Sequence, residues 1–473
     1  MTDDDLCYLT ATKAVALFKR RRLSPVELMG AIIRRCERVN PKLNAFTYTF
    51  FERAMAAARG AETRYAMTDG RLRPLEGVPL TVKDDHDVEG EITTHGSRIF
   101  AEKVSTRTVV AIARLLRAGA IMHARSTTPE FAAASICYSP LWGVTRNPWN
   151  RRYSPGGSTG GGGAAVAAVM TVLSDGADYA GSVRTPASCC GVFGFKPPRG
   201  RIPTRPPWNF NGFFSFRPIT RSVADGALMT NVMAGPHGSD VTALPKPRRL
   251  GPTFDPIKGW RAAYSLDLGF CEVHPDVRRN TLAAVETFRE LGCTVEEASP
   301  SWKWQVREAW LANHVAFMDA DPDCFVPRHK RHLLSDYIQG YARKKPTRHS
   351  LTFGQGVAYR AAMWATLGPI LERNHVFLCP TLAVPAVPAT LSPVAKEFRI
   401  NGKPIDPGLD WLMTYPFNAL PTLPVASVPS GFARTGVPTG LQIVGRPFDD
   451  ASVFLAAAAF EKARPWRGER PWL

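Results

Sequence analysis

The feature that most constrains the fold is a stretch of very small residues at 155–163, which reads Pro-Gly-Gly-Ser-Thr-Gly-Gly-Gly-Gly. Seven of these nine residues are glycine or proline, and an apolar, helix-like run over 164–170 follows at once. Glycine is favoured where a backbone turns sharply or approaches another group closely. The backbone of this loop is therefore expected to lie in close contact with another group. Neither G-x-x-x-x-G-K-[ST] nor a strand followed by G-x-G-x-x-G is matched, so a nucleotide site is not favoured.

Helical and strand-like patterns alternate along the chain. Ser24-Pro25-Val26-Glu27 forms a capping box with proline at the first helical position, which predicts a helix that runs to Val39 and ends at Pro41. A helical pattern over 107–118 precedes a short strand at 121–122. A strand over 264–270 precedes a helix over 274–291 and a strand over 293–295, and 302–374 is mostly helical. This alternation predicts an α/β fold with a mixed sheet covered by helices.

The composition excludes several classes of protein. With 473 residues, 45% of them apolar, the chain can bury a large core. The longest mainly apolar stretch, 164–173, is about half of what a membrane-spanning helix needs, so no membrane segment is expected. The N-terminus Met1-Thr2-Asp3-Asp4-Asp5 is acidic where a secretory signal is basic, which favours a cytoplasmic protein.

Neither the cysteines nor the net charge of +18 indicates a specific site. The nine cysteines have no C-x-x-C spacing, so buried reduced thiols are expected rather than a zinc ribbon or a disulfide framework. They are Cys7, Cys36, Cys137, Cys189, Cys190, Cys271, Cys293, Cys324 and Cys379. The densest basic run, Lys19-Arg20-Arg21-Arg22, has no interleaved aromatics and is typical of a solvated helix end, so nucleic acid is not expected as a partner.

A second serine and a lysine complete the candidate chemistry. Ser182 stands 24 residues after Ser158, in a small segment whose peptide N–H groups could stabilise the negative oxygen of a tetrahedral intermediate. A serine nucleophile needs a base, and the histidines lack the G-x-S-x-G context. Lys83 closes the apolar run 77–83, which looks like a buried strand, and a lysine held neutral by burial can accept a proton.

These residues together resemble the amidase signature family, the Ser-cisSer-Lys amide hydrolases. Further matches lie at 23–28, 40–46, 129–131, 145–150, 379–381 and 440–447, so the resemblance covers nearly the whole chain. It implies a single α/β domain over 1–473, with a mixed, mostly parallel central sheet flanked by helices. It also implies a signature core at 70–205 and a helical, substrate-shaping region at 300–375.

The resemblance also implies a role for each site residue. Ser182 would be the acylated nucleophile, Ser158 the bridging serine after a cis bond from Gly157, and neutral Lys83 the base that receives the proton of Ser182 through Ser158. No metal and no cofactor are implied. The oxyanion hole would be formed by the backbone N–H groups of Tyr179, Ala180, Gly181 and Ser182, with Thr159, Asp178 and Arg184 in support.

The sequence departs from the family pattern in three places. Ala180-Gly181 replaces the usual pair of glycines before the nucleophile. Alanine keeps the N–H group but adds a methyl group, so the oxyanion hole is expected to survive if the φ angle of Ala180 is compatible. Thr159 replaces a second serine and keeps its hydroxyl. The family's Gly-Lys-Thr-Asn stretch has become Ala124-Arg125-Ser126-Thr127.

Three other features have competing interpretations. Asp84-Asp85-His86-Asp87 looks like a metal cluster, but on a strand at most two of these side chains converge without a turn. Cys189-Cys190 lies near Ser182 in sequence, yet no base is identifiable for a thiol nucleophile. The tryptophans between 302 and 364 belong either to the core or to the substrate pocket, and the sequence leaves both open.

We therefore expect a hydrolase that cleaves the C–N bond of a small neutral amide, either an aryl amide, an oligoamide or a carbamate, through an acyl-enzyme on Ser182. One alternative is a glutaminase-type amidotransferase subunit that delivers ammonia in a tRNA-dependent complex, which the basic charge weakly favours. Another is a catalytically silent binding protein. The expected partner is a small-molecule amide, and a homodimer is suggested by analogy alone.

Overall fold

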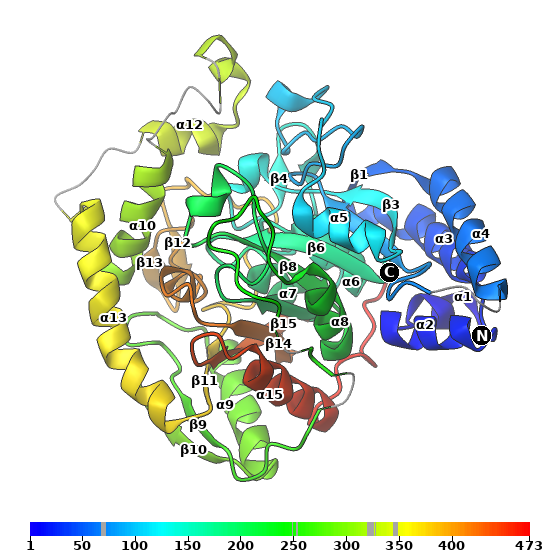
Figure 1. Cartoon of the computed structure of the whole chain (residues 1–473). Helices are drawn as coiled ribbons and strands as arrows, with labels where there is room; N and C mark the ends of the chain where they lie inside the picture. The colour runs from blue at the N-terminus through cyan, green and yellow to red at the C-terminus, as the bar shows by residue number, and fades with distance from the viewer. Residues whose placement is uncertain (68–71, 248, 252–253, 319–325, 327, 344–348) are drawn as a thin grey trace.

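One large sheet forms the centre of the molecule (Figure 1). The computed structural model describes all residues except 68–71, 248, 252–253, 319–325, 327 and 344–348. In the described chain, eleven strands join in the order β1-β3-β2-β6-β8-β7-β14-β15-β11-β9-β10. They are β1 (Phe46–Thr49), β2 (Pro79–Lys83), β3 (Ile121–Ser126), β6 (Leu173–Asp178), β7 (Phe193–Lys196), β8 (Ser215–Thr220), β9 (Arg261–Tyr264), β10 (Thr294–Glu297), β11 (Val376–Pro380), β14 (Val425–Phe432) and β15 (Pro438–Gly445).

The sheet is mixed, as expected, and its parallel pairings fall into two outer groups. β3, β2 and β6 run parallel to one another, and so do β11, β9 and β10. Every pairing from β6 through β8, β7, β14 and β15 to β11 is antiparallel, and β1 is antiparallel to β3. The six antiparallel pairs of this sheet outnumber the four parallel ones, so the mostly parallel pairing expected from the sequence is confined to the two outer groups.

Helices cover both faces of the sheet. The described α-helices are α1 (Asp3–Cys7), α2 (Ala11–Lys19), α3 (Pro25–Leu43), α4 (Phe51–Ala66), α5 (Val110–Arg117), α6 (Gly160–Ala167), α7 (Arg184–Cys190), α8 (Val223–Met233), α9 (Pro275–Glu290), α10 (Gln305–Met318), α12 (Asp336–Arg343), α13 (Phe353–Arg373), α14 (Pro416–Ala419) and α15 (Asp450–Ala463). Two short hairpins, β4 (Tyr138–Ser139) with β5 (Gly143–Val144) and β12 (Phe398–Ile400) with β13 (Lys403–Ile405), lie outside the large sheet.

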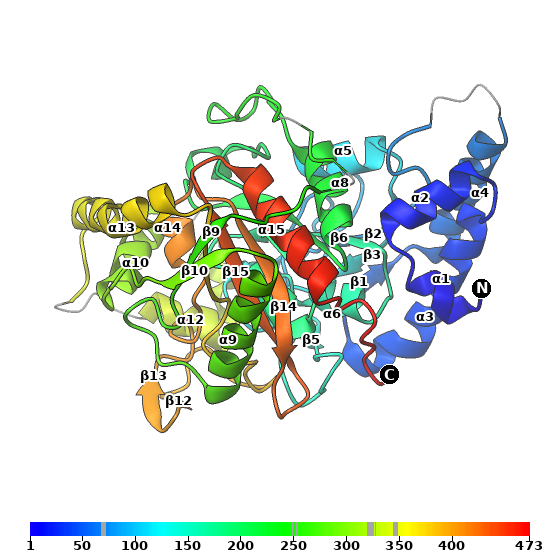
Figure 2. The same cartoon turned by 90° about the horizontal axis from the view of Figure 1, so that it is seen from below.

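The alternation of side chains along β14 and β15 separates two layers of core. Val428 and Ile443 pack with α8, α9 and α15 on one face, and Figure 2 shows α9 and α15 lying across these strands. Val425 and Val444 pack on the other face with α6, α7 and the segments around α10 and α13. In both views α1–α4 and the α10–α13 region lie at opposite ends of the molecule.

The capping box of α3 is present, but the prediction that Pro41 ends this helix is wrong. Ser24 caps the helix, which continues through Pro41 to Leu43 and stops at Asn44 in the left-handed conformation. Both Val39 and Leu43 are fully buried, so packing of the last turn outweighs the hydrogen bond that the proline cannot make.

Two other elements begin and end at different residues from those predicted. The strand expected at 264–270 lies earlier, at Arg261–Tyr264, because Leu268 and Gly269 adopt positive φ angles and turn the chain. The helix expected at 164–170 begins inside the glycine run, at Gly160, and ends at Ala167. The predicted helices near 107–118 and 274–291 are present as α5 and α9.

No described helix is long and apolar enough to cross a membrane. The cysteines in the described chain form no disulfide, and all of them except half-buried Cys271 are buried. Cys324 lies outside the described residues.

Candidate active site

Lys83 ends β2, a strand that is buried at every position. β2 pairs in parallel with β3 on one side and with β6 on the other, so the carboxyl ends of all three strands meet at one edge of the sheet. The Lys83 side chain is fully shielded from solvent, and its Nζ donates to Ser158 Oγ at 2.8 Å. The structure thus joins two of the three predicted catalytic side chains.

The glycine-rich loop packs as closely as its composition predicted. The Gly157–Ser158 peptide bond is cis. A Cβ atom at Gly157 would lie 2.7 Å from the carbonyl oxygen of Ala134, and one at Gly161 would lie 2.6 Å from that of Ala45. Side chains are therefore excluded where this loop crosses its neighbours, and α6 begins directly after Thr159.

Ser182 lies on the turn between β6 and α7, next to the glycine-rich loop. The N–H of Thr159 donates to the carbonyl oxygen of Ser182 at 3.0 Å, so the two predicted serines occupy adjoining backbone segments. Ser158 is buried, whereas Ser182 is half-buried and remains partly accessible. This is the difference in exposure expected between a bridging hydroxyl and a nucleophile that must meet a substrate.

In the turn before Ser182, carbonyl groups accept hydrogen bonds from side chains, whereas most N–H groups have no partner among the described residues. Trp310 Nε1 donates to the carbonyl oxygen of Tyr179 at 3.2 Å, and Thr414 Oγ1 donates to that of Ala180. Within the described part of the chain, the N–H groups of Tyr179, Ala180 and Ser182 donate to no acceptor. Three of the four predicted oxyanion-hole donors are therefore available.

Gly181, the fourth predicted donor, differs. Its N–H donates to Asp178 Oδ1 at 2.7 Å, because a φ angle of +121° turns this peptide back toward the carboxylate. A Cβ atom here would collide with the Thr414 side chain, so glycine is required at this position. Ala180 has no positive φ angle, and its extra methyl group is compatible with the turn.

Asp178 is the fixed charge behind this turn. It is fully buried and pairs with two buried guanidinium groups, Arg184 at 3.1 Å and Arg217 at 2.5 Å. Asn418 Nδ2 also donates to its carboxylate at 2.9 Å. Burial alone would raise the pKa of Asp178, but Arg184 and Arg217 outweigh burial and hold it well below its usual range.

Arg184 connects the turn to three residues from the C-terminal part of the chain. Its Nη1 donates to Gln442 Oε1 at 2.7 Å and to the Thr414 carbonyl at 3.0 Å, and its Nη2 donates to Asn418 Oδ1 at 2.6 Å. Asp178 and Arg184 thus occupy supporting positions around the turn. Thr159 contributes through its backbone, since its buried hydroxyl forms no hydrogen bond with a described residue.

A second ionic group, which the sequence did not reveal as part of the site, lies beside Lys83. Asp85 Oδ2 is 3.0 Å from Lys83 Nζ, and His86 lies between Asp85 and Asp175. The stretch 84–87 had suggested a metal cluster, but no group of three or more described His, Cys, Asp or Glu residues is arranged to hold a metal ion. The detectable sign was the dense charge that directly follows a buried strand.

Aromatic side chains surround Tyr179, the first residue of the turn. Its ring centroid lies 5.3 Å from Trp310, 5.6 Å from His314, 6.0 Å from Phe213 and 6.5 Å from Trp208. Of the tryptophans that the sequence left unassigned, Trp310 belongs to this cluster. Trp364 lies on the exposed surface of α13.

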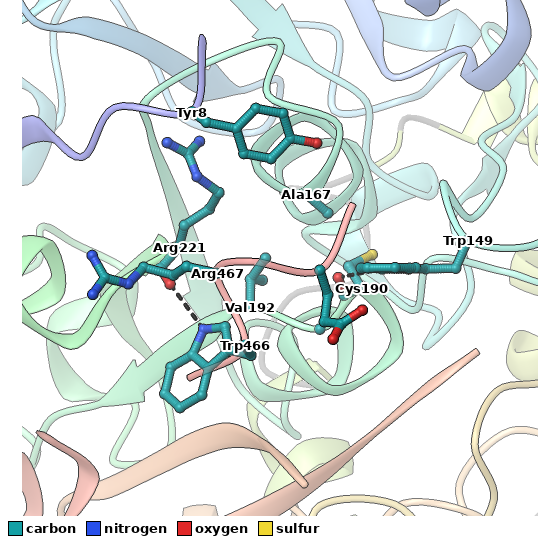
Figure 3. Close-up of a pocket in the computed structure, with 10 residues that line it drawn as sticks. Tyr8, Trp149, Ala167, Cys190, Val192, Arg221, Trp466 and Arg467 are labelled. Carbon is teal, nitrogen blue, oxygen red and sulfur yellow. Dashed lines mark hydrogen bonds between the residues drawn. The ribbon is translucent and has the colours of Figure 1, made fainter. Parts of the chain in front are cut away.

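The remaining candidates do not enter the site. Cys189 and Cys190 are buried, and burial raises the pKa of both thiols, which disfavours a thiolate nucleophile. A small pocket, shown in Figure 3, is lined by Tyr8, Arg221 and Trp466 and includes none of the predicted site residues. There the Trp466 indole donates to the Arg221 carbonyl at 2.9 Å.

Comparisons with known proteins agree with this geometry. The amidase family pattern matches residues 27–454. The acylamidase of Rhodococcus erythropolis is 36% identical over 475 residues, covering 100% of this chain and 98% of the relative. A glutamyl-tRNA(Gln) amidotransferase subunit from Geobacter metallireducens is 33% identical, covering 96% of each chain.

Solved structures give the same result. The crystal structure of a bacterial aryl acylamidase of the amidase signature family superposes with a TM-score of 0.88 at 27% identity, covering 98% of this chain and 99% of the other. The structure of 6-aminohexanoate cyclic dimer hydrolase superposes with a TM-score of 0.84 at 26% identity, with the same coverage. With a lysine, a buried serine and a half-buried serine gathered at one edge of this fold, the chain belongs to the amidase signature family and is an amidase that hydrolyses carbon–nitrogen bonds.

Proposed function

We propose that this amidase hydrolyses small neutral aryl amides through an acyl-enzyme on Ser182. The observation that carries the proposal is the aromatic cluster around Tyr179, because the same residue supplies both a free N–H group at the turn and a ring packed among other rings. A substrate carbonyl bound at this turn would bring its neighbouring group against that cluster. Aromatic rings pack favourably against one another in such surroundings.

The proposed reaction begins with attack of Ser182 Oγ on the amide carbonyl. Its proton passes to Ser158 Oγ as the proton of Ser158 passes to Lys83 Nζ, across the 2.8 Å contact between these two groups. The N–H groups of Tyr179, Ala180 and Ser182 stabilise the oxyanion. The relay then returns the proton to the departing amine, and water hydrolyses the acyl-enzyme.

The relatives support an acylated amide as substrate without specifying it. The 36% identical relative is an acylamidase, and the structure with a TM-score of 0.88 is an aryl acylamidase. The amidotransferase relatives are less similar, at 31–33% identity. We propose further that the 300–375 region shapes the substrate pocket, since Trp310 and His314 of α10 lie in the aromatic cluster.

The test is product formation by the purified protein from an equimolar panel of acetanilide, acetamide, a linear oligoamide, a phenyl carbamate and glutamine. We expect anilide cleavage to have the highest kcat/KM, and we expect Ser182→Ala to abolish it. Mass spectrometry of a rapidly quenched reaction should detect the protein plus one acyl group. Preference for glutamine would replace this proposal with the amidotransferase function.

A tryptophan substitution tests the aromatic cluster itself. Trp208→Ala should lower kcat/KM for acetanilide relative to acetamide by about 2- to 12-fold, the value of one aromatic contact. Trp364→Ala, on the exposed surface of α13, is the matched control and should leave this ratio unchanged. An unchanged ratio in Trp208→Ala would contradict a contact between the substrate and the Trp208 ring.

A further inference from the structure

The segment directly after the lysine folds back onto it. β2 ends at Lys83, and the N–H of His86 donates to the carbonyl oxygen of Lys83 at 3.1 Å, which closes a β-turn. This turn brings Asp85 Oδ2 to 3.0 Å from Lys83 Nζ. The lysine is fully buried and the Asp85 side chain is only 11% exposed, so water screens this ion pair weakly.

A chain of contacts links the turn that carries Asp85 to β6. Its Oδ1 lies 3.4 Å from His86 Nε2, and the other nitrogen of that ring contacts Asp175 Oδ2. Asp175 Oδ1 in turn accepts the backbone N–H of Lys83 at 2.9 Å. The His86 ring also packs edge-on against Phe216, with centroids 4.8 Å apart. Asp175 of β6 therefore holds the residues on both sides of Asp85, through the Lys83 backbone and the His86 ring.

The neighbouring carboxylate, Asp84, has partners of its own. Asp84 pairs with Arg125 at 3.6 Å and accepts the Thr94 N–H at 3.2 Å. Burial raises the pKa of Asp84 to about 6 and lowers that of His95 to about 4. Although burial opposes ionisation of Asp85, Lys83 lowers its pKa to about 2. Within the described part of the chain, the titratable groups around this cluster also include His86, Asp87, Lys103, Cys137, Asp175 and, beside Asp84, Tyr48.

We propose that Asp85 is a positioning residue that stabilises the ammonium form of Lys83, the state created when the proton of Ser182 arrives through Ser158. The inference rests on the proposed role of Lys83 as base. One proton moves from oxygen to nitrogen, and the carboxylate 3.0 Å away stabilises the resulting positive charge. A buried aspartate supports an imidazolium in the same way in Ser-His-Asp hydrolases.

This arrangement has two opposite consequences for the pH profile. Because Asp85 favours the protonated amine, the resting enzyme needs a higher pH before Lys83 can accept a proton. Because Asp85 also favours the state after proton transfer, it raises the rate once Lys83 is neutral. Removal of the carboxylate should therefore shift the acidic limb of the kcat/KM profile to lower pH and lower its plateau.

The experiment compares Asp85→Asn with wild type and with Asp87→Asn, which removes a carboxylate from the same loop that binds Ser105 rather than Lys83. In Asp85→Asn we expect the limb to shift down by about one pH unit or more, since an opposite charge at this range shifts protonation by roughly 1–3 units. The plateau should fall about ten- to hundredfold. Asp87→Asn should do neither.

Three further variants distinguish the possible explanations. Asp85→Glu restores a carboxylate and should recover most of the wild-type limb, and Asp85→Ser should shift the limb as Asn does if the Asn variant does not fold. A lower plateau with an unmoved limb in a folded variant would show a purely structural role and overturn the inference. Lys83→Met separates the two levels: if it retains wild-type activity, the proposed function itself fails, whereas an inactive Lys83→Met with an unmoved Asp85→Asn limb refutes only the role of Asp85.

Discussion

The charge of Asp178 should be a major contributor to stability, and Asp178→Asn tests this. Asparagine has nearly the same shape, but besides removing the charge it replaces one of two acceptor oxygens with an NH2 group that would face N–H donors. It leaves the guanidinium groups of Arg184 and Arg217 buried without a counter-charge. Breaking one side of a buried ion pair typically costs about 3–5 kcal/mol, a large share of the roughly 5–15 kcal/mol that stabilises a folded protein.

The assay is urea unfolding monitored by tryptophan fluorescence and by circular dichroism. The dependence of the free energy of unfolding on urea concentration, the m-value, is compared between variants. The matched control is Glu286→Gln, which breaks an exposed pair with Arg289 at 2.9 Å. Exposed pairs contribute about 0.2–1 kcal/mol, so the control should lie within that range. Asp178→Asn should also cost less in an Arg217→Met background, because one of the two uncompensated charges is then absent.

The pH dependence supplies an independent check. Arg184 and Arg217 hold the pKa of Asp178 well below its usual range. A depressed carboxyl pKa gives stability that is present above the unfolded-state pKa and is lost as the pH falls toward the folded-state value. The difference in the free energy of unfolding between wild type and Asp178→Asn should therefore become smaller below about pH 4. A loss under about 1 kcal/mol at pH 7 would refute the view that this carboxylate neutralises a buried positive cluster.

Three other substitutions follow from the structure. Ser158→Ala should lower kcat about 10²- to 10⁴-fold without changing the circular dichroism spectrum, because it removes the group between Lys83 and the nucleophile. Gly161→Ala should cost about 1–3 kcal/mol in urea unfolding, since its Cβ atom would meet the Ala45 carbonyl, whereas Gly354→Ala, with nothing within 4 Å, should be neutral or stabilising. Burial raises the pKa of Glu461 to about 7. The stability contributed by protonated Glu461 is therefore present below pH 4.5 and is lost as the pH rises through 7. The free energy of unfolding of Glu461→Gln should accordingly rise relative to wild type by up to about 3 kcal/mol over this range, and parallel pH profiles of the two proteins would contradict this.

The parts of the fold that could be predicted are those decided by short-range pattern. The buried strand β2 was visible as an apolar run that ends in one lysine, and Lys83 lies where that pattern placed it. The crowded glycine loop was visible because only close approach explains so many glycines together. The capping box fixed the start of α3 at Pro25 for the same local reason.

The parts that could not be predicted depend on distant partners. The end of α3 follows from burial of Leu43, which no local rule at Pro41 reveals. The run 264–270 is apolar enough for a strand, but pairing with β10 and β11 selects Arg261–Tyr264 instead. The occupied N–H of Gly181 likewise depends on Asp178, whose orientation is set by Arg184 and Arg217.

Asp85 was missed for a related reason. A strand pattern continued through 84–87 would place successive side chains on opposite faces of the sheet. The chain instead turns at once after Lys83, through the hydrogen bond from His86 N–H to the Lys83 carbonyl. The sequence therefore showed the charges and not the turn that directs one of them back to the amine.

β6 connects the two ionic groups that surround the serines. Asp175 and Asp178 lie three residues apart on this strand, so their side chains leave it on opposite faces. Asp175 accepts the backbone N–H of Lys83 and contacts His86, which fixes the base and its carboxylate neighbour. Asp178 accepts the N–H of Gly181 and fixes the turn that carries the oxyanion donors.

The register of β6 therefore determines the position of both the acid–base residues and the oxyanion donors. Between the two aspartates lies Gly176, where a Cβ atom would lie 2.6 Å from both Thr159 Oγ1 and Val183 Cγ2. A side chain at this position would separate the strand from the serine loop and from the start of α7 together. Because a shift of one residue would also move each aspartate to the wrong face, the acid–base side and the oxyanion side cannot be repositioned independently. We accordingly expect substitutions in β6 to impair proton transfer and oxyanion binding jointly, whereas substitutions at Asp85 should alter only the former.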